Sequence, residues 1–473
     1  MVETPERPTQ DERLQFLLQE TLELVGNRKF FELRRVLKEL EPADIAELMR
    51  ELGEEHADYE AVVFRLTPKD MTVRTFEHLS VDSQEDLLKQ LGDKDVADIL
   101  DDMSPDDRTQ LLEELPGQVT RQMLNLLSAA ERRIATQLLG YPEDSIGRQM
   151  TPDYVAVKPH WSMSEVLEHI RQYGRDSETL NVVYVVQRGG HLIDDIRLRD
   201  VLLAGRDTLV SELMDEQFVS LSANDDQEEA VAVFQRYDRS ALPVTDSSGV
   251  LVGIVTVDDV LDIAEEEATE DIQKLGGVEA LEEPYLTIAL HKLIRKRSLW
   301  LILLFFGQML TATAMGFYED QLQAALVLAI FMPLIISSGG NTGSQAATLI
   351  IRALTIGEVR LRDWWRVMRR EILSGIIIGG ILGTLGFLRI GVGEWLNGSY
   401  GAAWPYLGLT IGLSLMGIVL WGTLSGSLLP FALKRLGIDP ATSSAPLVAT
   451  LVDVTGLVIY FSVASVILRG VLL

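Results

Sequence analysis

The sequence predicts a multidomain membrane protein that combines an α-helical superhelical N domain, a duplicated α/β unit, a connecting helix and a five-helix transmembrane domain. Three observations support this fold class: charge and hydropathy change abruptly near residue 290, a helical motif repeats early in the chain, and an α/β motif repeats after it. The predicted segments are an N-terminal tail (1–19), the helical N domain (20–140), the α/β pair (141–264), the connecting helix (265–297) and the transmembrane domain (298–473).

Charge separates the chain into two parts. Residues 1–290 hold 62 Asp and Glu against 28 Lys and Arg, a net charge of −34, whereas residues 291–473 hold 8 against 14, a net charge of +6. The negative charge of the first part repels nucleic acid and attracts cations, divalent ones above all. The sequence has no cysteine, which excludes disulfides and thiolate metal sites. No nucleic-acid partner is expected.

Residues 20–140 are predicted to form a train of short amphipathic helices. The segments LKELEPADIAELM (37–49) and LKQLGDKDVADIL (88–100) repeat each other at an offset of 51, with apolar residues at i, i+3 and i+4 spacings. Helix pairs of this kind cannot bury their apolar faces alone, and they stack into a superhelical domain. At the start of a later helix, Ser104 is a candidate N-cap.

A second duplication, within residues 141–264, mixes strands with helices. The segment at 150–174 matches the one at 214–238, and HLIDDIRLRDVL (191–202) matches VLVGIVTVDDVL (250–261). Apolar strands such as NVVYVV alternate with amphipathic helices. The sequence therefore predicts two copies of one α/β unit in tandem.

This duplicated unit resembles the cystathionine-β-synthase (CBS) domain pair. The resemblance rests on a strand that ends in the pattern Gly-x-x-Ser/Thr-x-x-Asp, here Gly253, Thr256 and Asp259. In the first copy, Asp194 and Arg197 replace the glycine and the hydroxyl residue.

The resemblance to CBS pairs implies an adenosine nucleotide as a ligand. The aspartate that ends the pattern contacts the ribose in such pairs, and the first copy keeps it as Asp200, with Arg199 beside it. Because the rest of the pattern is altered in this copy, ATP binding is left open.

Five apolar segments are long enough to span a bilayer. They lie at 298–318, 322–337 with a continuation to 355, 372–393, 406–433 and 445–470. Twelve Lys and Arg lie in the loops on one side, and one lies in the loops on the other. By the positive-inside rule, the acidic domains are cytoplasmic and the C-terminus faces outward in a plasma or inner membrane. The lengths and the charge pattern argue against the alternative, buried helices of a soluble protein.

The second span contains PLIISSGGNTGSQ (333–345), which is rich in residues that disfavour a regular helix. Pro333, Gly339 and Gly340 are expected to break or kink it at membrane depth. Irregular backbone is tolerated there where it lines a watery cavity, and the amides of Asn341 and Gln345 suit an ion pathway. The alternative is a seam of small residues for helix packing, which needs no amides.

Asp453 is the only charged residue between positions 445 and 468, inside the fifth span. A carboxylate at the bilayer centre costs about 2.5–3.5 kcal/mol on insertion scales. No Lys, Arg or His lies near that depth in any span, so an ion pair does not account for it. We predict that Asp453 contacts a transported ion, with the hydroxyl of Thr450 close by.

An acidic run leads from the α/β pair to the membrane. Eight of the 14 residues from Asp258 to Asp271 are Asp or Glu. Spacings of three, four and four residues place four of them on one helical face, where like charges four residues apart destabilise the helix: Asp259, Asp262, Glu266 and Glu270. A solvated face is the ordinary explanation of such a run. We favour bridging by Mg²⁺, which keeps most of its water and needs only one or two carboxylates.

Together these features resemble the MgtE family of magnesium channels. The matching stretches are LGYPEDSIGRQMTPDYVAV (139–157), GIVTVDDVLDIAEEEATEDIQKLGG (253–277), PLIISSGGNTGSQ (333–345) and DPATSSAPLVATLVDVTGLVIYF (439–461). The resemblance implies a homodimer with a pore on its two-fold axis, lined by the second and fifth spans and closed by a plug helix after the CBS pair. One departure is Ala445, where relatives tend to have Asn, and it implies looser ion discrimination.

The resemblance also assigns residues. Asp453 matches the pore aspartate that recognises hydrated Mg²⁺. The Mg²⁺-sensing carboxylates of the family match Asp226, Glu228, Asp259, Asp262, Glu270 and Asp271. An aspartate of the N domain also takes part, with Asp101, Asp102, Asp106 and Asp107 as candidates.

The predicted function is a Mg²⁺-selective uptake channel that cytoplasmic Mg²⁺ holds shut by bridging the N domain, the CBS pair and the plug helix. Expected partners are a second copy of the chain, the lipid bilayer and Mg²⁺, with other divalent cations and ATP left open. Two alternatives stand: an ion-coupled secondary transporter of divalent cations, and a membrane-anchored CBS sensor that moves no ion. The sequence has no Walker or HExxH motif, so an enzyme is not expected.

Overall fold

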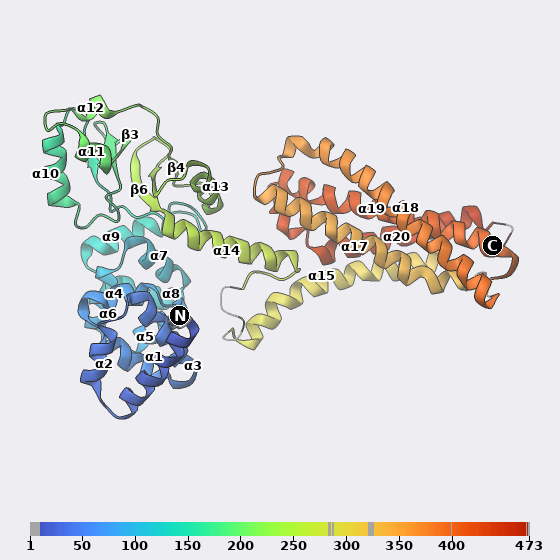
Figure 1. The fold of residues 1–473 in the computed structure, drawn as a ribbon, viewed down its shortest axis with the longest axis horizontal. Coiled ribbons are helices and arrows are strands. Elements are labelled where there is room, and N and C mark those ends of the chain that lie inside the picture. The colour runs from blue at the N-terminus through green and yellow to red at the C-terminus, as the bar shows by residue number, and fades with distance from the viewer. Residues whose placement is uncertain are drawn as a thin grey trace, which may run out of the picture. The chain divides into compact units, whose positions relative to one another are not determined.

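The computed structural model describes residues 10–281, 285, 288–319, 326–398, 400–469 and 471. The chain divides into two compact units, Met1–Ala264 and Glu265–Leu473. The first unit holds the helical N domain and the α/β pair, and the second holds the apolar helices (Figure 1). The predicted fold class is confirmed in these parts.

Short helices build the N domain. They are α1 (Gln10–Gly26), α2 (Phe30–Leu37), α3 (Pro42–Leu66), α4 (Lys69–Glu77), α5 (Val81–Gln90), α6 (Asp93–Asp102), α7 (Pro105–Glu114), α8 (Gly117–Leu126) and α9 (Ala129–Leu138). Helix α1 begins inside the segment predicted as a tail. It is helical there because Leu14, Leu17 and Leu18 pack against the core of the domain.

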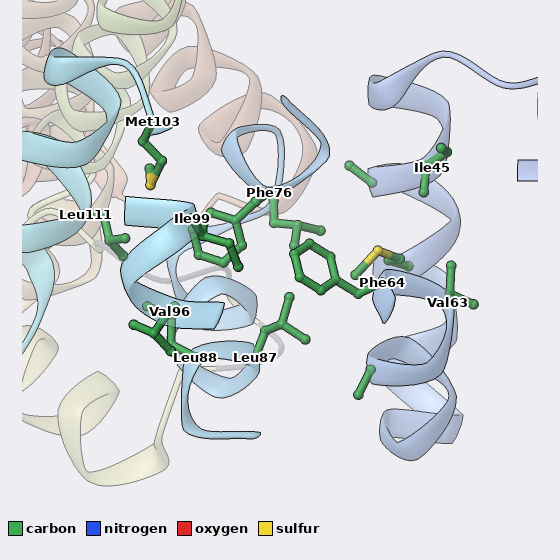
Figure 2. Packing of buried hydrophobic residues seen from close by; sticks show 14 of the residues in the cluster. Ile45, Val63, Phe64, Phe76, Leu87, Leu88, Val96, Ile99, Met103 and Leu111 are labelled. Atoms are coloured by element: carbon green, nitrogen blue, oxygen red, sulfur yellow. The ribbon is translucent and has the colours of Figure 1, made fainter. Parts of the chain in front are cut away.

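The repeat in the N domain is one helix–turn–helix junction used twice. Leu37 and Leu88 lie near the end of one helix, and Ile45 and Val96 lie in the first turns of the next. All four are buried in a single core. Figure 2 shows this core from close by, with apolar side chains of neighbouring helices packed together. Stacking onto one continuous core is what the repeat predicts.

Two sheets of the same strand order form the α/β pair within the described residues. The first contains β1 (Ala156–Val157), β2 (Val182–Val186) and β3 (Leu192–Arg197), and the second contains β4 (Leu221–Ser222), β5 (Ala241–Thr245) and β6 (Leu251–Thr256). In each sheet the first two strands are parallel and the last two antiparallel. The helices are α10 (Met163–Tyr173), α11 (Leu198–Leu203), α12 (Val210–Leu213) and α13 (Gln227–Tyr237).

The two α/β copies share an apolar interface. Tyr184 of the first copy packs with Leu251 and Ile254 of the second. The backbones of Thr151 and Ile254 exchange two hydrogen bonds of 2.9 Å. These contacts fix the end of β6, and β6 leads directly into α14 (Val257–Leu275), the helix that carries the acidic run.

Five helices among the described residues are long and apolar enough to span a membrane, as the sequence predicts. They are α15 (Leu290–Phe317), α17 (Val327–Thr355), α18 (Trp364–Asn397), α19 (Trp404–Arg435) and α20 (Ala445–Ile467). The 3₁₀ turns η1 (Leu361–Asp363), η2 (Gly401–Ala403) and η3 (Pro440–Thr442) precede the last three. Helix α17 packs against α19 and α20, α18 against α19, and α15 against α20 (Figure 1).

The prediction of a broken second span is wrong. Helix α17 is continuous from Val327 to Thr355, with Pro333 and the glycines inside it. Helices α19 and α20 pack closely against Gly339 and Gly343, which favours a regular backbone there, while Pro333 lies exposed within the helix. The predicted start of this span, at 322, lies outside the described residues.

The segment 265–297, expected to be one connecting helix, contains the ends of two. Helix α14 stops at Leu275, before the pair Gly276 and Gly277, and Gly277 has a φ of +73°. A left-handed glycine directly after the last helical residues is a common helix terminator. The first membrane helix, α15, then begins at Leu290, earlier than the predicted span.

Candidate ion pathway and cation-sensing carboxylates

Asp453 lies in the middle of α20 with its side chain half-buried. Its Oδ2 atom accepts a hydrogen bond of 2.9 Å from Nε2 of Gln308 on α15. Its Oδ1 atom faces α17, where it lies 3.7 Å from the position that a Cβ of Gly340 would occupy. The carboxylate therefore has a neutral amide on one side and a glycine surface on the other.

The glycines of α17 occupy two different surroundings. A Cβ at Gly339 would meet Ile418 of α19 and would lie 2.8 Å from Cγ1 of Val452, so this predicted pathway residue lies in a packing seam. Gly340 instead faces α20 with more room, since its Cβ would lie 3.5 Å from the Cβ of Ala449. Two adjacent residues of one helix therefore differ: Gly339 is tightly packed, and Gly340 has more space beside α20.

Polar side chains form a stripe along the exposed face of α17. Ser337, Asn341, Gln345 and Thr348 follow one another at spacings of four, four and three residues, and all are exposed in the protomer. Such a face requires water or another protein surface, because lipid chains cannot hydrogen-bond to it. Thr450, by contrast, is buried, and its hydroxyl donates to a backbone carbonyl one turn earlier in α20 at 2.9 Å.

In the first unit, carboxylates from three segments lie close enough to influence one another. We call them the interdomain carboxylates: Asp106 and Asp107 of α7, Glu178 before β2, and Asp258 and Asp259 of α14. Burial, with repulsion from Asp258 and Asp107, raises the pKa of Asp259 to about 6. Burial and the charge of Asp259 raise the pKa of Glu178 to about 7.

Asp106 is the most buried of the interdomain carboxylates, with 7% of its surface exposed. Its Oδ1 atom accepts no hydrogen bond from any described residue, and burial raises its pKa well above the usual range. Beside it, Ser104 stands at the N-cap position of α7 as predicted, but its hydroxyl donates to Asp107 at 2.6 Å instead of capping the helix. A buried, unpaired carboxylate oxygen is costly, and a cation or its water would satisfy it.

The arrangement fits a hydrated ion better than a bare one. In the part of the chain that the structure describes, no three His, Asp or Glu side chains lie close enough to enclose a metal ion. Mg²⁺ usually keeps several waters and binds through one or two carboxylates, so a tight cage is not required.

The other predicted sensing residues of the first unit either accept local hydrogen bonds or lie exposed. Asp101 accepts a hydrogen bond of 2.9 Å from the backbone of Ser128, and Asp102 is exposed at the end of α6. Asp226 is the N-cap of α13 and accepts from the backbone N–H of Glu228 at 3.0 Å. Asp262 is exposed on α14, toward the middle of the helix.

Near the end of α14, a lysine lies among the predicted carboxylates. Lys274 forms ion pairs of 2.6 Å with Glu270 and 2.7 Å with Asp439, in the loop before α20. Although burial opposes its charge, these two hydrogen bonds raise the pKa of Lys274. Burial, followed by the charge of Asp439, raises the pKa of Asp271. The end of α14 is therefore tied to the start of α20 by a protein ammonium group.

The altered pattern of the first CBS copy has a structural explanation. Asp194, which replaces the glycine, is fully buried, and its carboxylate accepts backbone hydrogen bonds of 2.9–3.0 Å from Asp195, Asp215 and Glu216. It therefore fixes the loop that follows α12. The predicted nucleotide residues Arg199 and Asp200 lie on α11; Arg199 is exposed, Asp200 is half-buried, and Nε of Arg199 lies 3.6 Å from Oδ1 of Asp200.

Known proteins match the chain along the same divisions. Family models match residues 40–144 (MgtE intracellular N domain), 144–207 and 210–266 (CBS domain) and 332–463 (divalent cation transporter). The magnesium transporter MgtE of Thermus thermophilus is 41% identical over 466 residues, which are 98% of this chain and 100% of that protein. The chain belongs to the MgtE family.

A second relative agrees with this MgtE assignment. The magnesium transporter MgtE of Bacillus subtilis is 32% identical over 93% of this chain and 95% of its own length. Among solved structures, the cytosolic domain of the Mg²⁺ channel MgtE in complex with ATP is 36% identical in sequence, with a TM-score of 0.48. The match covers 52% of this chain and 98% of the chain in that structure. The MgtE resemblance read from the sequence motifs is confirmed.

Three residues of this MgtE-family chain were missed by sequence reasoning. Gln308 binds the carboxylate of Asp453, Glu178 joins the interdomain carboxylates, and Lys274 pairs with two acids. Gln308 had a detectable signal, since it is an amide inside the first apolar span. Glu178 had none, because it lies in a loop far from its neighbours in sequence.

Proposed function

We propose that this MgtE-family protein is a Mg²⁺-selective channel that takes up Mg²⁺ across the cell membrane. The observation that carries the proposal is the half-buried carboxylate of Asp453 on α20, beside the glycine surface of α17. Mg²⁺ dehydrates reluctantly, so a carboxylate that contacts it through water suits a permeating ion better than direct ligation. The neutral amide of Gln308 leaves the charge of Asp453 available for that contact.

The functional unit that we propose is a homodimer with the pore on its axis. The support is the exposed polar stripe of α17, from Ser337 through Asn341 and Gln345 to Thr348. In a dimer, this stripe faces the water of a shared pore, and two Asp453 carboxylates hold one hydrated ion between them. The inside-negative potential drives the ion inward with about 4.6 kcal/mol per divalent cation at 100 mV.

We further propose that cytoplasmic Mg²⁺ closes this channel. The support is the set of interdomain carboxylates, among which burial and mutual repulsion raise the pKa values of Asp106, Glu178 and Asp259. Mg²⁺ bound among them stabilises the compact arrangement of the N domain and the CBS pair, and its loss favours separation. An ion can shift this equilibrium only by its difference in affinity for the two states, and several such sites together supply a few kcal/mol.

The proposed orientation places both domains of the first unit in the cytoplasm and the C-terminus outside. It rests on the basic loops of one membrane side.

We also extend the proposal to ATP, with Arg199 and Asp200 of α11 as its contacts. Calorimetric titration of ATP into the full chain and into Asp200→Ala tests this part, with weaker binding expected in the variant.

The test of the main proposal is patch-clamp recording of the full chain while cytoplasmic Mg²⁺ is varied. We expect currents that follow voltage without a counter-ion gradient, that disappear at high cytoplasmic Mg²⁺, and that are lost in Asp453→Asn. Uptake that requires a Na⁺ or H⁺ gradient would establish a coupled transporter instead. Uptake that Asp453→Asn leaves unchanged would refute the pore assignment.

A further inference from the structure

A hydrogen bond inside the helix bundle gives the first apolar helix a specific role. Gln308 of α15 donates from Nε2 to Oδ2 of Asp453 at 2.9 Å. Helix α15, which the structure describes over its whole length, buries none of its residues in the protomer. Gln308 therefore fills no core, and the hydrogen bond to Asp453 is its identifiable contact. An amide in an apolar helix is unfavourable unless it is hydrogen-bonded in this way.

The hydrogen bond acts on one oxygen of the carboxylate and leaves the other available. Oδ2 is held by Gln308, while Oδ1 is directed toward Gly340 on α17. An aspartate without such a partner can turn about its terminal side-chain torsion, which is broad and roughly two-fold, and expose either oxygen. The amide N–H also stands where a water of a hydrated cation would otherwise donate to Oδ2.

We propose that Gln308 is a positioning residue for the ion pathway, which fixes the Asp453 carboxylate so that Oδ1 accepts from the water shell of a hydrated divalent cation. The inference rests on the proposed function of Asp453 as the pore carboxylate. It assigns a determinant of ion affinity to α15, a helix that does not carry the polar stripe. In the absence of Gln308, the carboxylate loses one fixed orientation and binds the hydrated ion less well.

The test measures Mg²⁺ uptake by the full chain in proteoliposomes with a Mg²⁺-sensitive dye inside. Gln308→Met keeps the length of the side chain and removes the donor, whereas Gln308→Asn keeps the amide but shortens its reach. Thr313→Ala is the matched control on the same helix, because the Thr313 hydroxyl only donates back to the carbonyl of Met309 at 3.1 Å. The measured quantities are the half-saturating Mg²⁺ concentration and the maximal uptake rate.

We expect both Gln308 variants to raise the half-saturating Mg²⁺ concentration about three- to tenfold, equivalent to about 0.7–1.4 kcal/mol, at an unchanged maximal uptake rate. Thr313→Ala should match the unaltered protein in both quantities. A lower maximal rate at unchanged half-saturation would overturn the inference, since it indicates a structural role. Wild-type behaviour of Gln308→Asn would also overturn it, because polarity alone would then suffice.

Asp453→Asn, measured alongside, separates this inference from the proposed function. If it abolishes uptake while both Gln308 variants match the unaltered protein, only the role of Gln308 is refuted. If it leaves uptake unchanged, the pore assignment of Asp453 is refuted, and the positioning role with it.

Discussion

Replacing Asp259 by asparagine is expected to close the contact between the N domain and the CBS pair without Mg²⁺. Asp259 is one of the interdomain carboxylates, and its pKa of about 6 shows that its charged form is disfavoured in the compact arrangement. Its Oδ2 atom accepts hydrogen bonds from the backbone N–H of Thr256 at 3.2 Å and from the Thr256 hydroxyl at 2.5 Å. Asparagine can present its amide oxygen there, so the substitution removes the charge and keeps the local bonds.

The size of the effect follows from the pKa. An aspartate with an ordinary pKa of 3.8 that titrates at about 6 in the compact state carries about 3 kcal/mol of unfavourable free energy when ionised. Because the pKa is raised, this penalty is absent below about pH 4, grows as the pH rises toward 6 and is complete above it. At neutral pH, Asp259→Asn should therefore favour the compact state, by less than the roughly 100-fold that the whole penalty represents, because the charge of Asp258 on the same helix contributes to the penalty in both states.

The assay is hydrogen exchange on the full chain, read as protection factors of the α7 amides with Mg²⁺ and with EDTA. The unaltered protein is expected to protect α7 in Mg²⁺ and to lose that protection in EDTA at neutral pH. Asp259→Asn should keep it in both. Acidification to pH 5 should restore protection to the unaltered protein in EDTA, because protonation replaces the cation.

Asp102→Asn is the matched control, since it makes the same chemical change at an exposed carboxylate of the N domain. It should behave like the unaltered protein. If Asp259→Asn exchanges as fast as the unaltered protein in EDTA, or faster, then repulsion at this position does not separate the domains, and the reasoning fails.

Three further predictions concern packing and attachment. Gly339→Ala should destabilise the detergent-solubilised protein by about 1–3 kcal/mol, because the added Cβ meets Ile418 and Val452, whereas Gly340→Ala should melt like the unaltered protein. Equal melting temperatures of the two variants would contradict this distinction. Lys274→Met removes the ion pairs to Glu270 and Asp439, so the current measured at saturating cytoplasmic Mg²⁺ should rise. A current as low as that of the unaltered protein would show that the lysine does not hold α14. Asp194→Ala leaves three backbone N–H groups without their acceptor and should lower the free energy of unfolding by about 2–4 kcal/mol in denaturant titrations. Asp200→Ala should cost less, because its partner Arg199 is exposed, and similar losses in the two variants would argue against this account.

Periodicity and charge in the sequence predicted much of the fold because those signals are local. The helical repeat placed Leu37 and Leu88 at equivalent junctions, and the structure buries both in one core. The apolar runs placed five spans whose helices lie near the predicted positions. Helix continuity was harder to predict, because the packing of α19 and α20 against the glycines of α17 cannot be read from one segment.

By itself, the sequence determined that a carboxylate lies inside an apolar helix, that acidic residues precede the membrane part, and that the chain resembles the MgtE family. Each of these depends on residue types and their spacing along one segment. Only the tertiary structure decided that Gln308 binds Asp453, that Asp106 and Asp107 rather than Asp101 lie beside Asp259, and that Gly339 packs where Gly340 faces the carboxylate. These are contacts between segments far apart in the chain, and packing sets which side of each helix meets its neighbour.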